Sequence, residues 1–368
     1  MIRFGMLMAL GSVASGLSAQ TTPQAAERNQ QQVATEVYQG AWAPAPPVAH
    51  GSSAEVEDVQ FAPATQLTQL RVERNNALVQ GQGSISAADK AKLDQQALAI
   101  EANSPNSFEA HMARYYSAFP APAAFMHLDL AIARDRERPE LIGPQLVKAA
   151  RSDVPAEMSR WAQVMKEQGG IAAPLWAVAD DMLLSVDRDA VLFAAGEMDA
   201  FPLWTRQFAD GKRKDVLVVD HRLLNDPVYR QRVWARCKAA NTVPTSGDGF
   251  IEALAGATSR PVYVSPALGR DQLQPLKGRL YATGYALRYS TAPFRNMEVL
   301  AANWSRLSKT VQAGPLSKNY LFVGAILLNH YRGEENEAKA AALEHELRAL
   351  AKRLGATESM IRTGVFQH

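Results

Sequence analysis

Four polar residues end or directly follow two short apolar runs of the sequence; they are Glu197, Asp199, Asp220 and His221. Carboxylates and an imidazole act as general acids and bases in enzymes, and carboxylate oxygens also bind cations. If the two apolar runs form neighbouring parallel strands, these side chains lie at the carboxyl ends of the strands, where open α/β sheets bind their ligands. The sequence therefore predicts a candidate ligand-binding site made of these four residues.

The same residues also have a simpler structural interpretation. Asp199 lies just before Pro202, where a helix is expected to begin, and a carboxylate at that place caps a helix N-terminus. Asp220 ends a strand at a turn, a position that suits Asp. We favour this structural interpretation over catalysis, because strand-end acids also cap helices in sheets that have no active site.

Two strands and the helix between them are expected to position these residues. The runs 190–195 and 215–220 are short, continuous and apolar, as in strands that are buried on both faces. A helix is expected over 202–209, and a right-handed crossover makes the two strands parallel. Further strand patterns occur at 260–265 and within 279–289, and a further helix pattern occurs at 227–239. Residues 188–290 are therefore predicted to form a small doubly wound α/β domain with a mostly parallel sheet.

Helical regions are predicted on both sides of this domain. Residues 66–187 carry short helix pairs that resemble tetratricopeptide-like hairpins in architecture, although no clean 34-residue repeat occurs. The expected helices are 87–103, one between 104 and 119, 122–133, 139–150, 155–167 and 172–186. In residues 291–368, the segments 319–332 and 334–354 are expected to form a helical hairpin, since leucines recur in the second segment at helical spacing.

The N-terminus has the layout of a secretory signal peptide. A positively charged start is followed by a short apolar run and by small residues, and cleavage is expected near Ala19, so that 1–19 form the signal. We therefore expect a periplasmic or extracellular protein. Residues 20–65 are rich in Gln, Ala and Pro and are expected to be a disordered lead-in. No later segment reaches the roughly 18 apolar residues of a membrane span, so the mature chain is expected to lack an integral membrane segment.

Composition excludes several classes of protein. The chain has 368 residues, of which 47% are hydrophobic and 21% charged, and these values describe a globular protein rather than a disordered or collagen-like one. The net charge is only +2, so there is no large positive field to hold a polyanion. Nucleic acid is therefore not expected as a partner.

Common catalytic and cofactor motifs are missing from the sequence. No His-Glu-x-x-His spacing and no Gly-x-Ser-x-Gly elbow occurs, and the segment 246–250 lacks the residues of a P-loop or a dinucleotide fingerprint. Cys237 is the single cysteine, so neither an intramolecular disulfide nor a cysteine-based zinc cluster can form. We expect no cofactor and no metal ion.

The second half of the chain resembles the soluble C-terminal region of bacterial membrane proteins of the protein O-mannosyltransferase-like family, and related secreted proteins with helical repeats. The similar segments are 190–204, 211–220, the Leu-Leu-Asn turn at 223–225, 260–264 and 276–289. The acidic signature of that family is only partly kept: Asp199, Pro202 and Trp204 remain, whereas Glu197, Met198 and Ala200 replace its Asp, Asn and Thr. The resemblance implies a secreted accessory domain rather than a complete glycosyltransferase, because the membrane half of the family has no counterpart in this chain.

Three functional hypotheses follow from these observations. The first is a non-catalytic envelope protein that binds a partner protein or a glycan. The second is an envelope enzyme that acts on glycans with the four strand-end residues as acid, base or cation ligands. The third is a scaffold that uses its helical hairpins as a docking surface.

Overall fold

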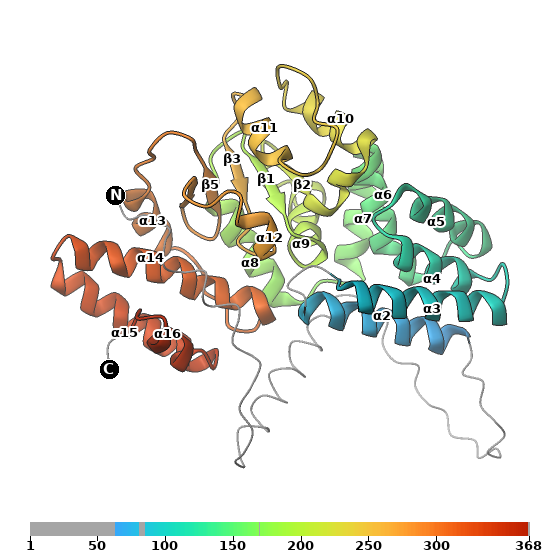
Figure 1. Ribbon diagram of the computed structural model, residues 1–368, viewed down its shortest axis with the longest axis horizontal. Helices are drawn as coiled ribbons and strands as arrows, with labels where there is room; N and C mark the ends of the chain where they lie inside the picture. Colours follow the sequence, from blue (N-terminus) through green and yellow to red (C-terminus); the bar gives the residue numbers. More distant parts are fainter. Residues whose placement is uncertain (1–62, 81–84, 169, 367–368) are drawn as a thin grey trace, which may run out of the picture.

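The computed structural model describes residues 63–80, 85–168 and 170–366, and Figure 1 shows a central sheet with helices on both sides. The predicted signal peptide lies outside the described residues, as does the predicted lead-in apart from 63–65, which begin the first described helix. No helix in the described part of the chain is long and apolar enough to cross a membrane.

Seven α-helices of the described residues precede the sheet; α2 to α7 lie on one side of the molecule, and α8 lies near its centre (Figure 1). They are α2 (Pro63–Gln80), α3 (Ala87–Asn103), α4 (Phe108–Ala118), α5 (Pro122–Arg134), α6 (Ile142–Ser152, after the 3-10 turn η2 at Pro139–Leu141), α7 (Pro155–Glu167) and α8 (Ala173–Leu184). Serine caps begin two of them, since the hydroxyl of Ser86 accepts the Asp89 N–H and that of Ser107 accepts the Ala110 N–H. The helices expected in this region are confirmed, and the tetratricopeptide-like arrangement stays a prediction.

The sheet has five strands in the order β2-β1-β3-β5-β4. The strands are β1 (Val191–Ala194), β2 (Leu217–Asp220), β3 (Val262–Val264), β4 (Leu280–Ala282) and β5 (Leu287–Tyr289). β1 is parallel to both β2 and β3, as the βαβ pattern predicts, but β5 is antiparallel to β3 and β4. The sheet is therefore mixed rather than mostly parallel, because the last two strands are joined by a short connection that reverses the chain.

Side chains cover the outer strands of the sheet. The Gln207 amide donates to the Val216 carbonyl at 2.8 Å, and the Trp204 indole donates to Val218 at 3.3 Å beside β2. On the other side, the Asn296 amide donates to the Ala282 carbonyl of β4 at 2.7 Å. These bonds satisfy carbonyls that a sheet edge otherwise offers to another chain.

Helix α9 (Glu197–Phe208) connects β1 to β2 and begins five residues before the predicted start at 202. The prediction placed the start at Pro202 because proline is favoured in a first turn. Instead, Pro202 lies inside the helix, where it removes one backbone hydrogen bond, and Gly196 is the N-cap residue. The structure therefore puts Glu197 and Asp199 in the first turn of α9 rather than in a loop before it.

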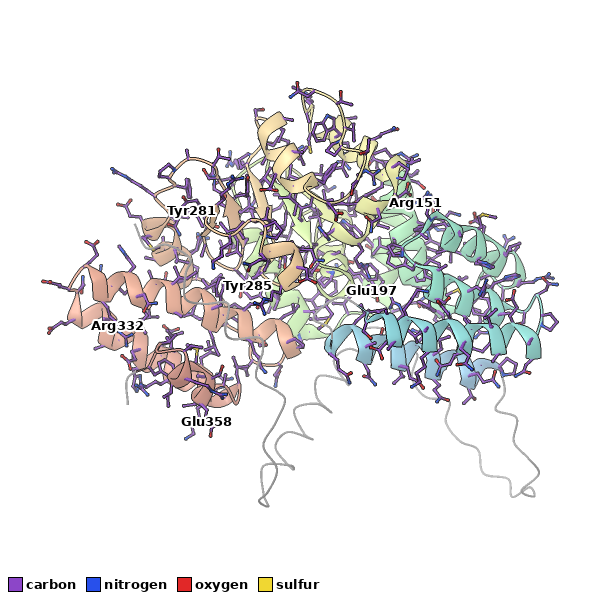
Figure 2. All side chains as sticks on the ribbon, viewed as in Figure 1. Arg151, Glu197, Tyr281, Tyr285, Arg332 and Glu358 are labelled. Atoms are coloured by element: carbon purple, nitrogen blue, oxygen red, sulfur yellow. The ribbon has the colours of Figure 1, made fainter. Side chains whose placement is uncertain are left out.

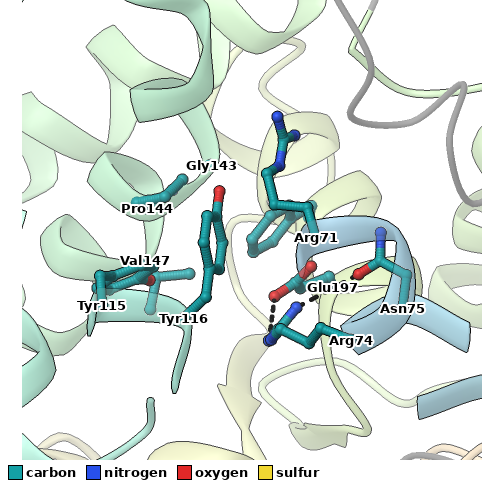
Figure 3. A pocket seen from close by; sticks show the side chains of 10 residues that line it. Arg71, Arg74, Asn75, Tyr115, Tyr116, Gly143, Pro144, Val147 and Glu197 are labelled. Carbon is teal, nitrogen blue, oxygen red and sulfur yellow. Dashed lines mark hydrogen bonds and ion pairs between the residues drawn. The ribbon is translucent and has the colours of Figure 1, made fainter. Parts of the chain in front are cut away.

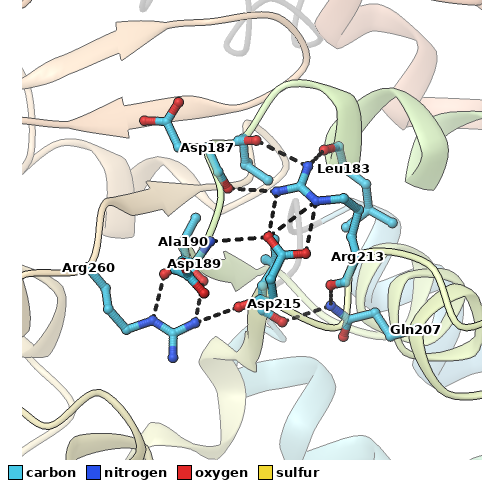
Figure 4. A network of polar contacts seen from close by, with 10 residues as sticks. Leu183, Asp187, Asp189, Ala190, Gln207, Arg213, Asp215 and Arg260 are labelled. Atoms are coloured by element: carbon cyan, nitrogen blue, oxygen red, sulfur yellow. Dashed lines mark hydrogen bonds and ion pairs between the residues drawn. The ribbon is translucent and has the colours of Figure 1, made fainter.

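Arginine side chains join the loops at the amino ends of the strands (Figure 4). The Arg213 guanidinium donates to the Leu183 and Val186 carbonyls at the end of α8 and forms an ion pair of 3.0 Å with Asp215. Arg260 donates to the Asp215 carbonyl at 2.7 Å. A cation that binds the free carbonyls at a helix C-terminus stabilises that helix, so this end of the sheet is a structural junction.

The remaining helices of the described residues follow β2 in the chain, and the last of them form the C-terminal side (Figure 1). They are η3 (His221–Asn225), α10 (Pro227–Arg236), α11 (Phe250–Ala257), α12 (Arg270–Leu273), α13 (Met297–Trp304), η4 (Gly314–Lys318), α14 (Asn319–Gly333), α15 (Glu337–Arg353) and α16 (Thr357–Arg362). α14 and α15 pack against each other, which confirms the predicted hairpin. The buried Asp181 carboxylate of α8 accepts hydrogen bonds of 2.6 Å from the Ser308 and Tyr320 hydroxyls, and these bonds fasten the C-terminal side to the centre.

Candidate functional site

The carboxyl ends of β1 and β2 bring the predicted acidic residues together. Ala194 and Asp220 are register partners in the parallel pair, so the residues that follow each strand leave the sheet at the same edge. Figure 2 shows Glu197 at this edge, near the centre of the molecule. His221 is half-buried in η3 and makes no hydrogen bond or ion pair with the three carboxylates within the described residues. The structure thus groups three of the four predicted residues, and His221 lies beside them without a direct bond.

Glu197 is held between two arginines. Its Oε1 atom lies 3.1 Å from the Arg74 guanidinium of α2 and 3.1 Å from the Arg222 guanidinium of η3. The Glu197 side chain is only 13% exposed. Burial alone would raise the pKa of Glu197, but the positive charges of Arg74 and Arg222 outweigh burial and lower this pKa to about 2. Glu197 is therefore ionised at neutral pH and forms ion pairs with Arg74 and Arg222.

Asp220 is completely buried and shares Arg222 with Glu197. Its Oδ2 atom lies 2.7 Å from Nη2 of Arg222, and its Oδ1 atom accepts from Nε of Arg222 at 3.0 Å. The Arg222 backbone N–H also donates to Oδ1 at 3.0 Å. The two parallel side-chain bonds form the fork geometry in which Arg and carboxylates pair most strongly. Arg222 further lies 4.8 Å from the centre of the Phe119 ring, which adds a cation–π contact.

Asp199 binds the backbone at the start of α9. Its carboxylate accepts the Ala195 N–H at 2.8 Å and the Gly196 N–H at 2.9 Å. Asp199 as a whole residue is 2% exposed. Burial raises the pKa of Asp199, although the two backbone N–H groups act in the opposite direction. The carboxylate thus binds the two backbone N–H groups directly before α9 from the third position of the helix, as in a capping box. The structural interpretation placed Asp199 before the helix instead.

A narrow pocket opens beside this cluster, between α2, α4, α6 and α9 (Figure 3). Its empty volume is about 330 Å³, yet its enclosed part has room for about one water-sized group. Arg74 and Glu197 form part of its wall, and Tyr115 and Tyr116 of α4 face them. The polar groups at the strand ends therefore contact the N-terminal helices rather than a wide crevice.

Arg74 and Arg222 are not among the site residues that the sequence predicted. Arg74 pairs with a residue 123 positions later, and no local pattern connects the two. One signal did exist, since Arg74 lies on the buried face of α2, at offsets of seven and four from the buried Leu67 and Leu70. A cation among core positions predicts a buried anionic partner, because an unpaired buried charge is costly.

The strand-end carboxylates bind protein groups that stabilise the fold and orient α9 and η3. Within the described residues, no group of three or more His, Cys, Asp or Glu is placed to hold a metal ion. The cluster is therefore a compensated set of charges, in which two arginines pair with Glu197 and Asp220, and Asp199 binds the backbone at the start of α9.

Comparison with known proteins found one family model that matches part of the chain. The fold and the cluster describe an α/β unit with helices on both sides, joined to the N-terminal helices by the buried ion pair of Arg74 and Glu197. The family model of TMEM260-associated domain 2 matches residues 176–249, from α8 to the segment before α11. No curated protein matches the chain, and no solved structure matches it either. The matched segment includes all four predicted site residues and Arg222, and it is similar to that domain over about a fifth of the chain.

The stability of the protein is expected to fall in acid because Glu197 becomes protonated. Its pKa is about 2 in the folded chain and near 4.5 in the unfolded chain, so its contribution is present above the unfolded value and is lost as the pH falls toward 2. We expect a loss of about 3 kcal/mol in the free energy of unfolding from this group between about pH 5 and pH 2. Chemical denaturation at a series of pH values measures it.

The matched variants for this measurement are Glu197→Gln and Glu298→Gln. Glu298 is exposed on α13, so its variant is expected to keep the acid dependence of the unmodified protein. The Glu197→Gln variant is expected to be less stable at neutral pH and to show a flatter dependence. Equal slopes for both variants would contradict the assignment of this acid dependence to Glu197.

Proposed function

We propose that this chain is a non-catalytic binding protein of the cell envelope that recognises a partner protein or a glycan. The observation that carries the proposal is the bridging of Glu197 and Asp220 by Arg222, with Arg74 as the second cation on Glu197. A general base or a cation ligand needs an available lone pair at the reacting position. In this cluster Glu197 and Asp220 are paired with arginines, and Asp199 binds the Ala195 and Gly196 N–H groups. These contacts support a structural role in which the carboxylates hold helices on the sheet.

Similarity to an accessory domain supports the same proposal. Residues 176–249 are similar to TMEM260-associated domain 2. The resemblance of the second half to the soluble C-terminal region of protein O-mannosyltransferase-like membrane proteins fits a domain that assists recognition. We propose that the signal peptide at 1–19 exports the chain to the periplasm or the outside of the cell, and that the helices α2 to α8 contribute to its docking surface.

Asp199→Asn tests this proposal, because one of the two backbone N–H groups bound by Asp199 then loses its acceptor. We expect the free energy of unfolding to fall by about 0.5 to 2 kcal/mol, as for other lost caps, with binding unchanged. Thermal-shift and titration measurements against a panel of envelope oligosaccharides and envelope proteins give both readouts. Asp271→Asn, in an exposed position, is the control and is expected to change neither stability nor binding.

A second candidate function is an envelope enzyme that acts on glycans. The observation that favours it is Asp199, a buried carboxyl with a raised pKa beside Asp220, since such groups gather at catalytic sites. This candidate expects Asp199→Asn to abolish turnover of a glycan substrate while the unfolding midpoint stays the same. That result would replace the binding proposal.

A further inference from the structure

A second hollow of the molecule lies between α2 and α3, away from the strand-end cluster. It has an empty volume of about 400 Å³, and its lining residues are mostly carboxamides: Gln66, Gln69, Gln96, Ala99, Ile100 and Asn103. We call this hollow the amide groove. Its lining contains no charged side chain, and Ile100 and Ala99 give it a small apolar surface.

A carboxylate orients two of these amides from behind. Oε1 of Glu73 accepts from Nε2 of Gln69 at 3.1 Å, and Oε2 accepts from Nε2 of Gln96 at 2.7 Å. Lys92 balances the charge of Glu73 at 2.9 Å. Because a carboxylate accepts hydrogen bonds and cannot donate one when ionised, it fixes which end of each amide faces it. The amide oxygens of Gln69 and Gln96 are therefore turned away from Glu73.

Two acceptors of the amide groove have no donor. Oε1 of Gln66 and Oε1 of Gln96 are buried, and neither accepts a hydrogen bond from the described part of the chain. A buried acceptor without a partner destabilises the structure, and a ligand that supplies a donor removes this cost. Gln69 and Asn103 are exposed at the rim and can turn to complete the contacts.

We propose that the amide groove binds a neutral, hydroxyl-rich ligand, a glycan chain. Each sugar hydroxyl donates one hydrogen bond and accepts others, so neighbouring hydroxyls fit the adjacent oxygen and nitrogen of a carboxamide. The groove has no cationic lining residue to hold a phosphate or a carboxylate ligand, and the nearby Lys92 is paired with Glu73.

This inference rests on the proposed binding function and adds a place and a ligand class to it. The groove is formed by α2 and α3, whereas the proposal above rests on the ends of β1 and β2. Neither site shares a lining residue with the other. An experiment can therefore contradict the proposal for one site and leave the proposal for the other unaffected.

The test is a titration of the full chain with neutral trisaccharides of glucose, mannose and N-acetylglucosamine, followed by calorimetry or by chemical-shift changes. We expect saturable binding of at least one of them at millimolar concentrations or below. Gln96→Leu is expected to weaken it by at least about tenfold, since it removes an oriented acceptor and leaves a surface of similar volume. Glu73→Ala is expected to weaken it less, because Glu73 is a positioning residue.

Gln163→Leu is the matched control. Gln163 is an exposed amide of α7 that donates to Glu167 at 2.7 Å, and its replacement is expected to leave the affinity unchanged. The unfolding midpoint of each variant is measured in parallel to show that it is folded. If the Gln96→Leu and Gln163→Leu variants bound the trisaccharide with equal affinity, the assignment of the site to the amide groove would be overturned. A glycan-binding function would remain. If none of the trisaccharides bound, or if an acidic or a basic peptide displaced them, the groove assignment would be overturned as well.

Discussion

Arg222→Ala is expected to lower the free energy of unfolding by about 3 to 5 kcal/mol, because it leaves the buried Asp220 carboxylate without its cation. Asp220 is 0% exposed, and both of its carboxylate oxygens bind Arg222. Glu197 keeps one cation, Arg74, so most of the cost comes from Asp220. Urea denaturation followed by circular dichroism measures the change.

The matched control is Arg236→Ala in the nearby helix α10. Arg236 also forms an ion pair, with Asp153 at 2.8 Å, but its side chain is 46% exposed. Exposed pairs contribute about 1 kcal/mol or less, so the control is expected to lose at most that amount. If the two variants lost the same stability, the cluster at the strand ends would not be the buried junction that the geometry describes.

Gly284→Ala is expected to destabilise the protein by about 3 kcal/mol, because the backbone conformation and the space at this position both require glycine. Gly284 has a φ of +145°, and a Cβ atom there would lie 2.2 Å from Oγ of Ser185. Ser185 cannot move away freely, since its hydroxyl donates to the Asp181 carbonyl at 2.6 Å and accepts the Tyr285 N–H at 2.7 Å. The turn between β4 and β5 is thus packed directly on the end of α8.

The control for this variant is Gly256→Ala in α11. Nothing lies within 4 Å of a Cβ atom at Gly256, and alanine is a better helix former than glycine. We expect this control to be neutral or to gain up to about 1 kcal/mol. Thermal unfolding of both variants measures the change in stability. A Gly284→Ala protein as stable as the control would show that the contact with Ser185 is not as close as described.

Local patterns in the sequence predicted most helices and the parallel core of the sheet. Serine caps and periodic apolar residues mark the ends of α3 at 87 and 103, and the proline at 155 marks the start of α7. β1 and β2 were predictable because they are short runs that are buried on both faces. In the C-terminal hairpin, Leu343, Leu347 and Leu350 are all buried, as their spacing predicts.

Long-range contacts account for what the sequence did not reveal. The direction of β4 and β5 depends on a turn packed against Ser185, about a hundred residues earlier in the chain. The early start of α9 depends on the bonds from Asp199 to the backbone before it, and the proline at 202 pointed to a later start. The site was predicted as a group of acids, but its charge balance comes from Arg74, which no spacing rule connects with Glu197.

The most direct test of the compensated cluster is a double-mutant cycle between Arg74 and Glu197. The free energies of unfolding of the unmodified chain, Arg74→Met, Glu197→Gln and the double variant give the coupling energy of the pair. The buried ion pair across 123 residues predicts a favourable coupling of about 1 to 3 kcal/mol. A coupling within about 0.3 kcal/mol of zero would mean that Glu197 is not held by Arg74, and the strand-end carboxylates would again be candidates for catalysis or cation binding.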